Sequence, residues 1–253
     1  MLEILVTNDD GVNAPGIRAL AEKLREIGNV TVVAPAREMS AVSHALTISE
    51  PLRFESIEPG VFAVEGTPAD CVNLAVGKLL AKPPDIVVSG VNRGANVGDD
   101  IAYSGTVGGA REAAMLGRPS IAVSLATRSE DSDYSNATRF IAELVPTVLG
   151  KNSWSRRTFL NVNVPDARIQ GVRITSQGRR EYFAKVEERI DPRSRVYYWI
   201  KKGFSRWEKN GMSDIAALRD RYISVTPLQF DFTAYSVLDE LDSWKLNFNG
   251  DGR

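Results

Sequence analysis

The feature that most constrains this chain of 253 residues is a regular alternation of short apolar runs with helical patterns. The runs Leu2–Thr7, Val30–Ala34 and Ile86–Val88 read as buried strands, and apolar residues at helical spacing fill Pro15–Ile27. Short strands separated by helices favour a parallel sheet that is covered on both faces. We therefore predict a doubly wound α/β fold built on a mostly parallel sheet.

The alternation of strands and helices fills about the first 125 residues, and a further helix and strand follow. Thr67 is a plausible helix cap, because Pro68 follows it and an acid, Asp70, stands three residues on. The further predicted elements are a weak strand at Phe62–Val64, a helix from Thr67 to about Leu80, a helix at Thr106–Leu116, a strand at Ile121–Leu125, a helix at Phe140–Leu149 and a strand at Phe159–Val164.

The character of the sequence changes after about residue 155, where arginines and aromatic residues become frequent. The run Tyr197–Ile200 indicates a hairpin or an extended arm. Exposed aromatics on an arm pack against a second subunit or cover the open edge of the sheet, and the sequence leaves both alternatives open. Beyond the arm, Tyr222–Thr226 predicts a late strand and Val237–Leu246 a short helix.

Composition excludes several classes of function. The net charge of -1 gives no electrostatic case for binding a nucleic-acid duplex or an anionic membrane, and no apolar run approaches the roughly 20 residues that span a bilayer. Cys71 is the single cysteine, and the first residues lack a signal pattern, so we expect a protein of the reducing cytoplasm. His44 is the single histidine, which makes a soft-metal centre improbable and an oxygen-bound hard cation the expected metal.

The first strand runs directly into Asn8-Asp9-Asp10-Gly11. Two adjacent carboxylates at the end of a buried strand repel each other, and burial raises the cost of their charge further. A bound cation is the usual relief. The alternative is an ordinary turn, since Asp-Gly is a common turn dipeptide. The rest of the chain favours chemistry, because other strands also end in oxygen-rich or glycine-rich loops that a parallel sheet gathers at one edge.

The most glycine-rich of these loops runs from Ser89 to Asp100 and leads through Ser104 and Gly105 into the helix that starts near Thr106. Glycine lets the backbone approach a ligand closely, and a helix start offers free N–H groups to an anion such as phosphate. The alternative is simple capping by Ser104 or Thr106. With the long glycine and asparagine loop before it, anion binding is the better interpretation.

Familiar nucleotide and nucleophile motifs are missing. The glycines fit neither the dinucleotide fingerprint nor the P-loop, and no G-x-S-x-G elbow occurs. What remains is a set of oxygen ligands that would meet at one sheet edge if their strands are neighbours: Asp9, Asp10, Ser40 and Asn92. Carboxylate, hydroxyl and amide oxygens suit magnesium or manganese, and a hard cation beside a helix start is a phosphate-handling arrangement.

At this point the chain resembles the SurE family of stationary-phase survival proteins, which are metal-dependent 5′/3′-nucleotidases. The similarity covers most of residues 2–228, and the combination of NDDG with the later glycine loop is highly specific. The matching segments are ILVTNDDG, VVAPAREMSAVSHALTI, GTPADCV, IVVSGVNRGANVGDDIAYSGTVGGAREAA, PSIAVS, NVNVP, Gln177–Arg180, Tyr197–Trp199 and YISVTPL.

The resemblance implies a Rossmann-like core at residues 1–155. It implies that residues 156–253 hold C-terminal strands, a β-hairpin that subunits exchange and a terminal helix, in a homodimer or homotetramer. It implies one divalent cation per subunit, Mg²⁺ or Mn²⁺, on Asp9, Asp10, Ser40 and Asn92. It also implies phosphate contacts from Ser104, Gly105 and Thr106, with Asn96 nearby.

Two features depart from the family pattern. The residue before Ser104 is often histidine in this family, and here it is Tyr103, which puts any acid role of that side chain in doubt. The loop Met39–His44 is also less glycine-rich than is typical of the family, so its mobility is expected to differ.

The combined hypothesis is hydrolysis of nucleoside monophosphates, with Asp9, Asp10, Asn96 and Ser104 as the catalytic residues. Asp9 or Asp10 would orient a metal-bound water and take its proton, while amides near Gly105 hold the phosphoryl oxygens. His44 could protonate the leaving oxygen, although a lone loop histidine is more often incidental. Ser104 as a covalent nucleophile is a lesser alternative, because no base stands beside it in the sequence. The rivals are a nucleotide sensor without turnover and a metal-using glycosyltransferase.

Overall fold

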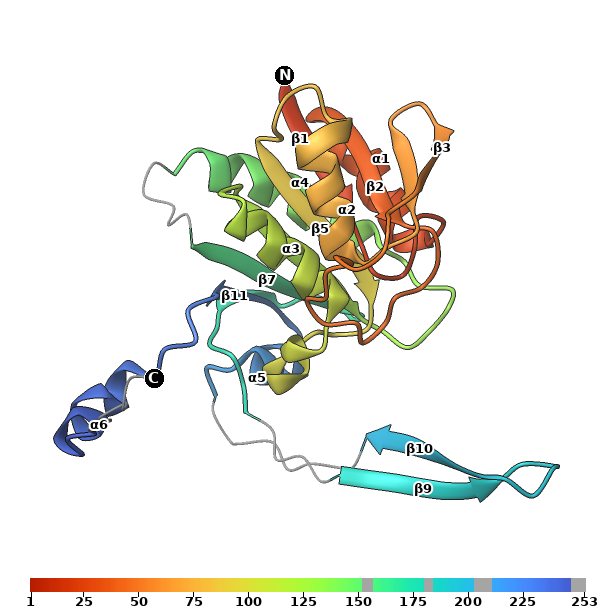
Figure 1. Ribbon diagram of the computed structural model, residues 1–253. Helices are drawn as coiled ribbons and strands as arrows, with labels where there is room; N and C mark the ends of the chain where they lie inside the picture. The colour runs from red at the N-terminus through yellow and green to blue at the C-terminus, as the bar shows by residue number, and fades with distance from the viewer. Residues whose placement is uncertain (152–156, 180–183, 203–210, 247–253) are drawn as a thin grey trace, which may run out of the picture.

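The computed structural model describes residues 1–151, 157–179, 184–202 and 211–246 (Figure 1). The fold is built on one nine-stranded sheet, whose strands lie in the order β3-β4-β2-β1-β5-β6-β7-β11-β8. The strands of this sheet are β1 (Leu2–Thr7), β2 (Gly28–Pro35), β3 (Phe54–Glu58), β4 (Val61–Val64), β5 (Ile86–Arg93), β6 (Ser120–Ala126), β7 (Thr158–Pro165), β8 (Gly171–Ile174) and β11 (Tyr222–Gln229).

Helices cover both faces of the sheet. The helical elements are α1 (Pro15–Leu24), α2 (Pro68–Leu74) with the π turn η1 (Ala75–Leu79), the short turn η2 (Gly98–Ala102), α3 (Gly105–Met115), α4 (Ser135–Leu149), α5 (Asp214–Arg219), the turn η3 (Tyr235–Val237) and α6 (Leu238–Ser243). In Figure 1, α2 and α3 lie in front of the sheet, whereas α1 and α4 lie behind it. Apolar strand residues alternate between these two layers, so Ile4 and Val6 pack toward α1, and Leu5 packs toward α2.

The strand order confirms the predicted doubly wound α/β class with a mostly parallel sheet. All neighbouring pairs from β4 to β7 are parallel, and only β3 with β4 and β11 with β7 run antiparallel. The chain moves from β1 outward to β2 and β4, and then returns to place β5 on the other side of β1. A sheet of this kind binds ligands where the order reverses, at the carboxyl ends of β1 and β5. Asp9, Asp10 and Asn92 all lie there.

Local chemistry explains the helix starts. The Thr67 hydroxyl accepts from the Asp70 amide, and the Asp70 carboxylate accepts from the Thr67 amide at 2.8 Å, which completes the predicted capping box. Ser104 caps α3 by accepting from the Val107 amide at 3.1 Å. The capping alternative for Ser104 is therefore confirmed.

Several elements differ from the sequence prediction. Strands β3 and β8 and helix α5 were not predicted, and α4 begins at Ser135 rather than Phe140. Every residue of β3 is exposed, so it lacks the apolar alternation that marks a half-buried strand. Helix α5 has only six residues, too few to show a helical period. The helix predicted from Thr67 to Leu80 widens into the π turn at Ala75.

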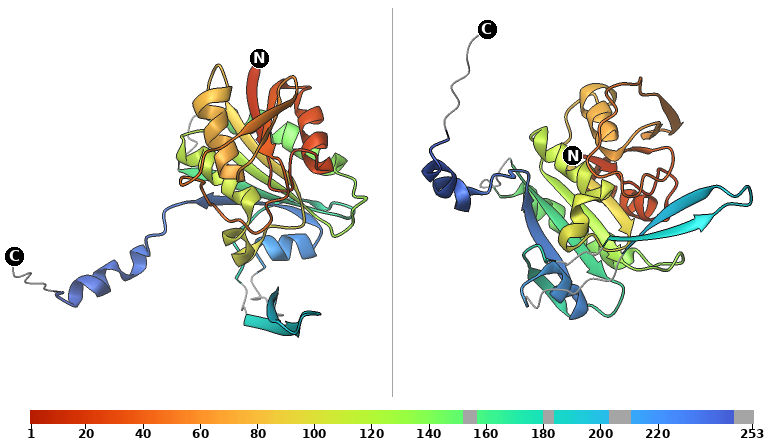
Figure 2. Two further views of the ribbon diagram at one scale, coloured as in Figure 1. Left: turned by 45° about the vertical axis from the view of Figure 1, so that its right-hand side comes forward. Right: turned by 60° about the horizontal axis from the view of Figure 1, so that its bottom comes forward.

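Residues after 183 confirm the predicted hairpin. Strands β9 (Ala184–Ile190) and β10 (Val196–Lys202) pair antiparallel with each other, in a sheet separate from the main one. They extend away from the body, as does α6 (Figures 1 and 2). The alternative in which the aromatics of this hairpin cover the open edge of the main sheet is therefore wrong. The β9–β10 hairpin is called the arm below.

Candidate metal and phosphate site

Asp9 is a buried carboxylate at the end of β1, with 4% of its surface exposed. Its pKa is raised from 3.8 to about 6, and burial is the largest cause. Among the smaller influences, which this value includes, hydrogen bonds from the Thr106 side chain and backbone lower the pKa and the neighbouring Asp10 raises it. The Thr106 hydroxyl donates to Asp9 Oδ1. Asp9 therefore sits at the start of α3, where the helix dipole favours negative charge.

Asp10 faces the end of β5. Its Oδ2 accepts from the Arg93 backbone amide at 3.1 Å. The pKa of Asp10 is raised, chiefly by burial and then by the nearby carboxylate of Glu38, against the hydrogen bond from Arg93. Gly11 follows with φ +98, so the turn alternative is confirmed in its backbone. The turn does not relieve the charge, because both carboxyl groups remain buried or half-buried beside one another.

Two further oxygens reach this edge from neighbouring segments. The Met39 amide donates to the Asp9 carbonyl at 2.7 Å, which brings the adjacent Ser40 to the end of β1. The Ser40 hydroxyl donates to Glu38 Oε1 at 2.6 Å and keeps its lone pairs free to coordinate. Asn92 stands next to Arg93, the residue that contacts Asp10. Its Nδ2 donates to the Gly94 carbonyl at 2.7 Å, and within the described ranges no group donates to its Oδ1.

The start of α3 lies directly against Asp9. A Cβ added at Gly105 would lie 2.7 Å from the Asp9 Cβ, so no larger residue fits without moving the carboxylate. The first amides of a helix have no partner within the helix. Here the Val107 amide donates to the Ser104 hydroxyl, and the Thr106 amide donates to the Asp9 carboxylate. Gly105 therefore stands where its amide can meet an anion beside the two acids.

Asn96 is held from three directions and is 9% exposed. Its amide donates to Asn163 Oδ1 at 2.8 Å, and its carbonyl accepts from both Asn161 and Asn163. Its Nδ2 donates to Ser124 Oγ at 2.9 Å. The asparagines of β7 thus fix the loop after β5. The Asn96 side chain is anchored by Ser124, which leaves its Oδ1 as the atom available to other groups.

His44 and Tyr103 do not converge on the acids. His44 Nε2 lies 2.5 Å from Oε2 of Glu112, which is two turns along α3 from the helix start. A histidine engaged in this way is poorly placed to protonate a leaving group at Gly105. The side chain of Tyr103 is 62% exposed. The Ser104 hydroxyl caps α3, and no hydrogen bond joins it to a basic side chain among the residues described.

The donor set fits a hard divalent cation. It combines two carboxylates, whose pKa values are raised chiefly by burial, with one hydroxyl and one amide oxygen. In the described part of the chain, no three histidine, cysteine or acidic residues cluster as a metal site. That finding agrees with a predicted ligand set that contains only two such residues.

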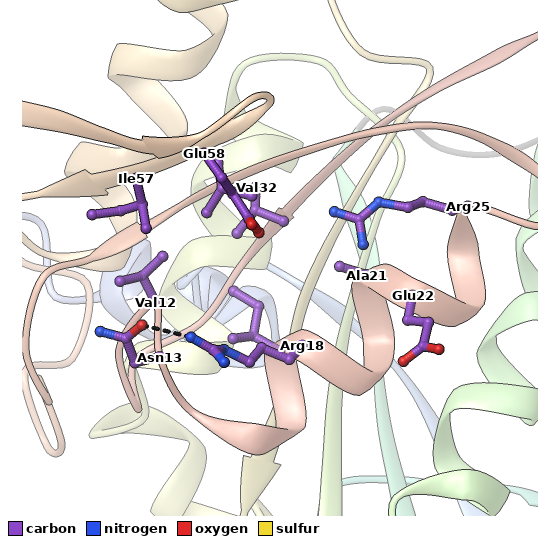
Figure 3. Close-up of a pocket in the computed structure, with 11 residues that line it drawn as sticks. Val12, Asn13, Arg18, Ala21, Glu22, Arg25, Val32, Ile57 and Glu58 are labelled. Atoms are coloured by element: carbon purple, nitrogen blue, oxygen red, sulfur yellow. Dashed lines mark hydrogen bonds between the residues drawn. The ribbon is translucent and has the colours of Figure 1, made fainter.

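Two cavities lie near the first turn of the chain, and one of them borders Asp10. One of about 200 Å³ borders Asp10 itself, with Glu38, Arg93, Glu130 and Tyr134 around it. Another of about 270 Å³ lies between α1 and the β3–β4 turn (Figure 3). Its charged residues have both signs, with Arg18, Glu22 and Arg25 from α1 and its C-terminal end, and Glu58 from β3. This second cavity carries no net attraction for phosphate and shares no residue with the predicted site.

The structure adds residues that the sequence analysis missed. Asp214, at the start of α5, is 1% exposed, and its carboxylate accepts from the backbone amides of Gly98, Gly178 and Ile215 at 2.8 to 2.9 Å. It therefore ties the loop after β5 to the C-terminal part of the chain. No sequence signal marks this role, because its partners Gly98 and Asp214 are 116 positions apart.

Fold and site together define a doubly wound α/β protein with paired acids at its switch point and a helix start directly beside them. The family described as "Survival protein SurE" matches residues 4–184, and the chain belongs to the SurE family. The chain is 55% identical to the 5′-nucleotidase SurE of Geobacter sulfurreducens over 97% of its own length and 95% of the relative's. It is 52% identical to the 5′-nucleotidase SurE of Geobacter metallireducens, with 96% and 97% covered.

A solved structure is also similar. The crystal structure of the SurE protein from Aquifex aeolicus superposes with a TM-score of 0.83 at 42% identity, covering 96% of this chain and 99% of that one. At this identity the likeness extends from the fold to the family. Within the residues that the structure describes, every helix is too short or too polar to cross a bilayer.

Proposed function

We propose that this chain is a metal-dependent phosphomonoester hydrolase that releases inorganic phosphate from nucleoside 5′- and 3′-monophosphates. The observation that carries the proposal is the buried Asp9 carboxylate at the start of α3, in a chain 55% identical to a 5′-nucleotidase. A buried acid pair is costly without a cation, and a helix start is costly to leave without an anion. A metal-bound phosphate satisfies both.

The residues that would hold the cation are Asp9, Asp10, Ser40 and Asn92, one cation per subunit, with Mg²⁺ and Mn²⁺ as the fitting ions. When bound, such an ion lowers the pKa of a water so that hydroxide is available near neutral pH. The raised pKa values of both aspartates support this assignment, because binding would replace their lost hydration.

The chain's own residues position the substrate and move the proton. Asp9 or Asp10 orients the attacking water and accepts a proton from it. The Gly105 amide, with the Ser104-Gly105-Thr106 turn around it, faces the phosphoryl oxygens, and Asn96 supports them from the loop after β5. Ser104 acts here through the helix cap, as part of the phosphate-binding turn.

We further propose that the arm joins copies of this chain into a homodimer or homotetramer by exchange between subunits. One face of the arm is mostly apolar, with Glu188 as its charged member, and its exposed apolar residues are Val186, Ile190, Val196, Tyr198 and Ile200. The other face holds Glu187 with Arg189 and Lys201. An isolated two-stranded hairpin with so much exposed apolar surface gains stability by burying it.

In this proposal residues 1–155 form the catalytic core and residues 156–253 supply the C-terminal strands, the oligomerisation hairpin and the terminal helix. The buried, unpaired Cys71 suits the reducing cytoplasm. The chain's net charge of -1 supports small nucleotides as substrates over a nucleic-acid duplex.

The decisive experiment is a phosphate-release panel over nucleoside 5′- and 3′-monophosphates, with Mg²⁺, with Mn²⁺ and with a chelator. We expect metal-dependent release that the chelator stops. A nucleotide sensor would bind without release, and a glycosyltransferase would require a nucleotide sugar and leave the monophosphates intact. Release that is equally fast with the chelator would contradict the proposal.

A further inference from the structure

The loop between β2 and β3, residues 36–53, contains no helix or strand and yet carries Ser40, one of the four proposed metal ligands. Two of its residues, Ala41 and Ser43, hold φ values of 58 and 60. Non-glycine residues adopt this region reluctantly, so the loop keeps this path only if contacts on both sides enforce it. Ser40 is thus placed by its neighbours rather than by regular structure.

One face of α3 is shaped to receive this loop. A Cβ at Gly105 would lie 3.1 Å from Val42 Cγ1, and a Cβ at Gly108 would lie 2.5 Å from the Ser43 carbonyl oxygen. Positions 105, 108 and 112 follow one another along the same helical face. The two glycines therefore let the loop backbone rest directly on α3, and Glu112 lies at the far end of the contact.

His44 closes this contact. Its Nε2 lies 2.5 Å from Glu112 Oε2, and both side chains are largely buried. The second carboxylate oxygen, Oε1, accepts from Asn73 of α2 at 2.6 Å. Although burial raises it, the hydrogen bonds from His44 and Asn73 hold the pKa of Glu112 below its ordinary value. Asn73 thus orients the carboxylate that His44 meets.

On the other side of Ser40, the loop is fixed by the Met39 amide on the Asp9 carbonyl at 2.7 Å. Beyond His44, Thr47 binds both carboxylate oxygens of Asp70. The segment from Ser40 to Ser43 thus starts at the fixed Met39 and ends at Ser43 and His44. The Ser43 amide donates to the Tyr103 carbonyl at 3.0 Å and its hydroxyl donates to the Ala102 carbonyl at 2.7 Å, whereas His44 fastens the loop to α3 itself. Loss of the His44 contact would loosen the far end of the strained segment and let Ser40 shift.

We propose that His44 is a positioning residue, whose hydrogen bond with Glu112 fastens the loop to α3 and holds Ser40 in place beside Asp9 and Asp10 for the cation. This inference rests on the proposed metal-dependent function. His44 touches neither the metal nor the substrate in this assignment. It acts through the loop, so its effect falls on metal affinity and leaves the chemistry of the loaded site intact.

The first test is calorimetric titration of the full-length chain with Mg²⁺. We expect His44→Ala to raise the dissociation constant about tenfold, equivalent to about 1.4 kcal/mol. His44→Gln should stay within about twofold of the unmodified chain, because its side-chain amide can still donate to Glu112. The control is Asp220→Asn, which removes the Arg173–Asp220 pair of 2.7 Å at the far end of the sheet and should leave Mg²⁺ affinity unchanged.

Turnover of a nucleoside monophosphate gives the second readout. His44→Ala should raise the Mg²⁺ concentration for half-maximal rate about tenfold, with kcat at saturating Mg²⁺ within about twofold. A fall in kcat that saturating Mg²⁺ cannot restore would overturn the positioning role.

The third readout needs no variant and no activity. His44 is the single histidine of the chain, so the imidazole N–H of a chain labelled with ¹⁵N-histidine reports on this contact alone. Coupling between two sites is reciprocal, so Mg²⁺ must strengthen the His44–Glu112 contact by the factor that the contact strengthens Mg²⁺ binding. We expect saturating Mg²⁺ to slow exchange of that proton with water about tenfold.

The outcomes separate the two proposals. If the unmodified chain binds no Mg²⁺ and releases no phosphate, the proposed function and the role of His44 both fail. If it binds Mg²⁺ but His44→Ala binds equally well, or if the imidazole proton exchanges equally fast with and without Mg²⁺, only the role of His44 fails. Should His44→Ala not fold, the exchange measurement on the unmodified chain still decides.

Discussion

Two regions depart from the usual pattern of burial in opposite ways: the carboxyl edge of the sheet, which carries Asp9 and is called the edge below, and the arm. At the edge, Asp9 is a carboxylate with 4% of its surface exposed. On the arm, Trp199 is 55% exposed and Ile200 is 89% exposed. Charged side chains are seldom buried without a partner, and large apolar ones seldom gather on an open surface. Each region therefore requires a binding partner that a single copy of the chain does not supply.

The two deficits differ in kind. A buried charge is satisfied by a small counter-ion that fits between a few oxygens, whereas an apolar face is satisfied only by another surface of similar area. The edge is thus expected to bind a small ligand, and the arm is expected to bind another protein surface. Substitutions at the edge should therefore change catalytic activity and leave the oligomeric state unchanged. Substitutions on the arm should change the oligomeric state and leave the activity per subunit unchanged.

The sharpest test of this contrast is Asp9→Asn. We expect phosphate release to fall at least about a thousandfold and Mg²⁺ binding to be lost, because the cation loses its most buried charged ligand. The oligomeric state, measured by light scattering, should not change. Retention of metal-dependent turnover within about tenfold of the unmodified chain would refute the assignment of the edge.

The same variant should make the metal-free chain more stable at neutral pH. The pKa of Asp9 is about 6 when folded against 3.8 when unfolded, so the folded state binds more protons between these values. Stability therefore falls as pH rises from about 3.8 to about 6, by about 3 kcal/mol in total. Denaturant unfolding with a chelator should show this loss in the unmodified chain and its reduction in Asp9→Asn.

Gly105→Ala tests the edge without changing any charge. Its Cβ would meet the Asp9 Cβ at 2.7 Å and Asp9 Oδ2 at 2.9 Å, so the carboxylate must move. A displacement of this size at a reacting centre costs about a hundredfold in kcat/KM. Gly77→Ala is the matched control, because a Cβ there meets nothing within 4 Å. Equal activity of the two variants would show that Asp9 has room to shift.

Asp214→Asn examines the link between the core and the C-terminal part. The carboxylate accepts three backbone hydrogen bonds. In Asp214→Asn a side-chain NH₂ group replaces one oxygen, and it would point at backbone N–H groups that are themselves donors. We expect the unfolding free energy to fall by about 2 kcal/mol, since bonds to a charged group contribute about 1.5–3 kcal/mol each. Chemical denaturation measures this, with Asp220→Asn as an exposed control. A change below about 0.5 kcal/mol would contradict the account.

Ile200→Asp addresses the arm and should have the smallest effect on chemistry. A charge on the apolar face should weaken self-association about tenfold or more, seen as a shift toward monomer by sedimentation. The kcat/KM per subunit should stay within about twofold. Loss of activity together with assembly would show that a neighbouring copy completes the site, and the contrast drawn above would then need revision.

The sequence predicts features whose cause is local. The strand ends that place Asp9, Asp10 and Asn92 follow from short apolar runs, and the Thr67 cap follows from its spacing to Asp70. Because parallel strands share an edge, the meeting of these loops follows from the fold class alone. The roles of the four ligands stay predictions until metal binding is measured.

Features with a long-range cause could not be predicted. The contact between His44 and Glu112 joins residues 68 apart, and nothing in the periodicity of either segment refers to the other. The same holds for Asp214 and Gly98. Strand β8 has only four residues and alternates between exposed and half-buried, so its place in the sheet depends on β11 rather than on its own pattern.

The position of β11 has a consequence for biosynthesis. This strand, at residues 222–229, lies between β7 and β8, although both precede it in the chain. During synthesis, β8 therefore has no neighbouring strand until residues 222–229 have been made. The loop of Asn96 and Gly98 likewise lacks its Asp214 anchor until α5 has been made. A nascent chain that ends before α5 would hold the acid pair without the completed fold, so we expect catalytic competence only once β11 is in place.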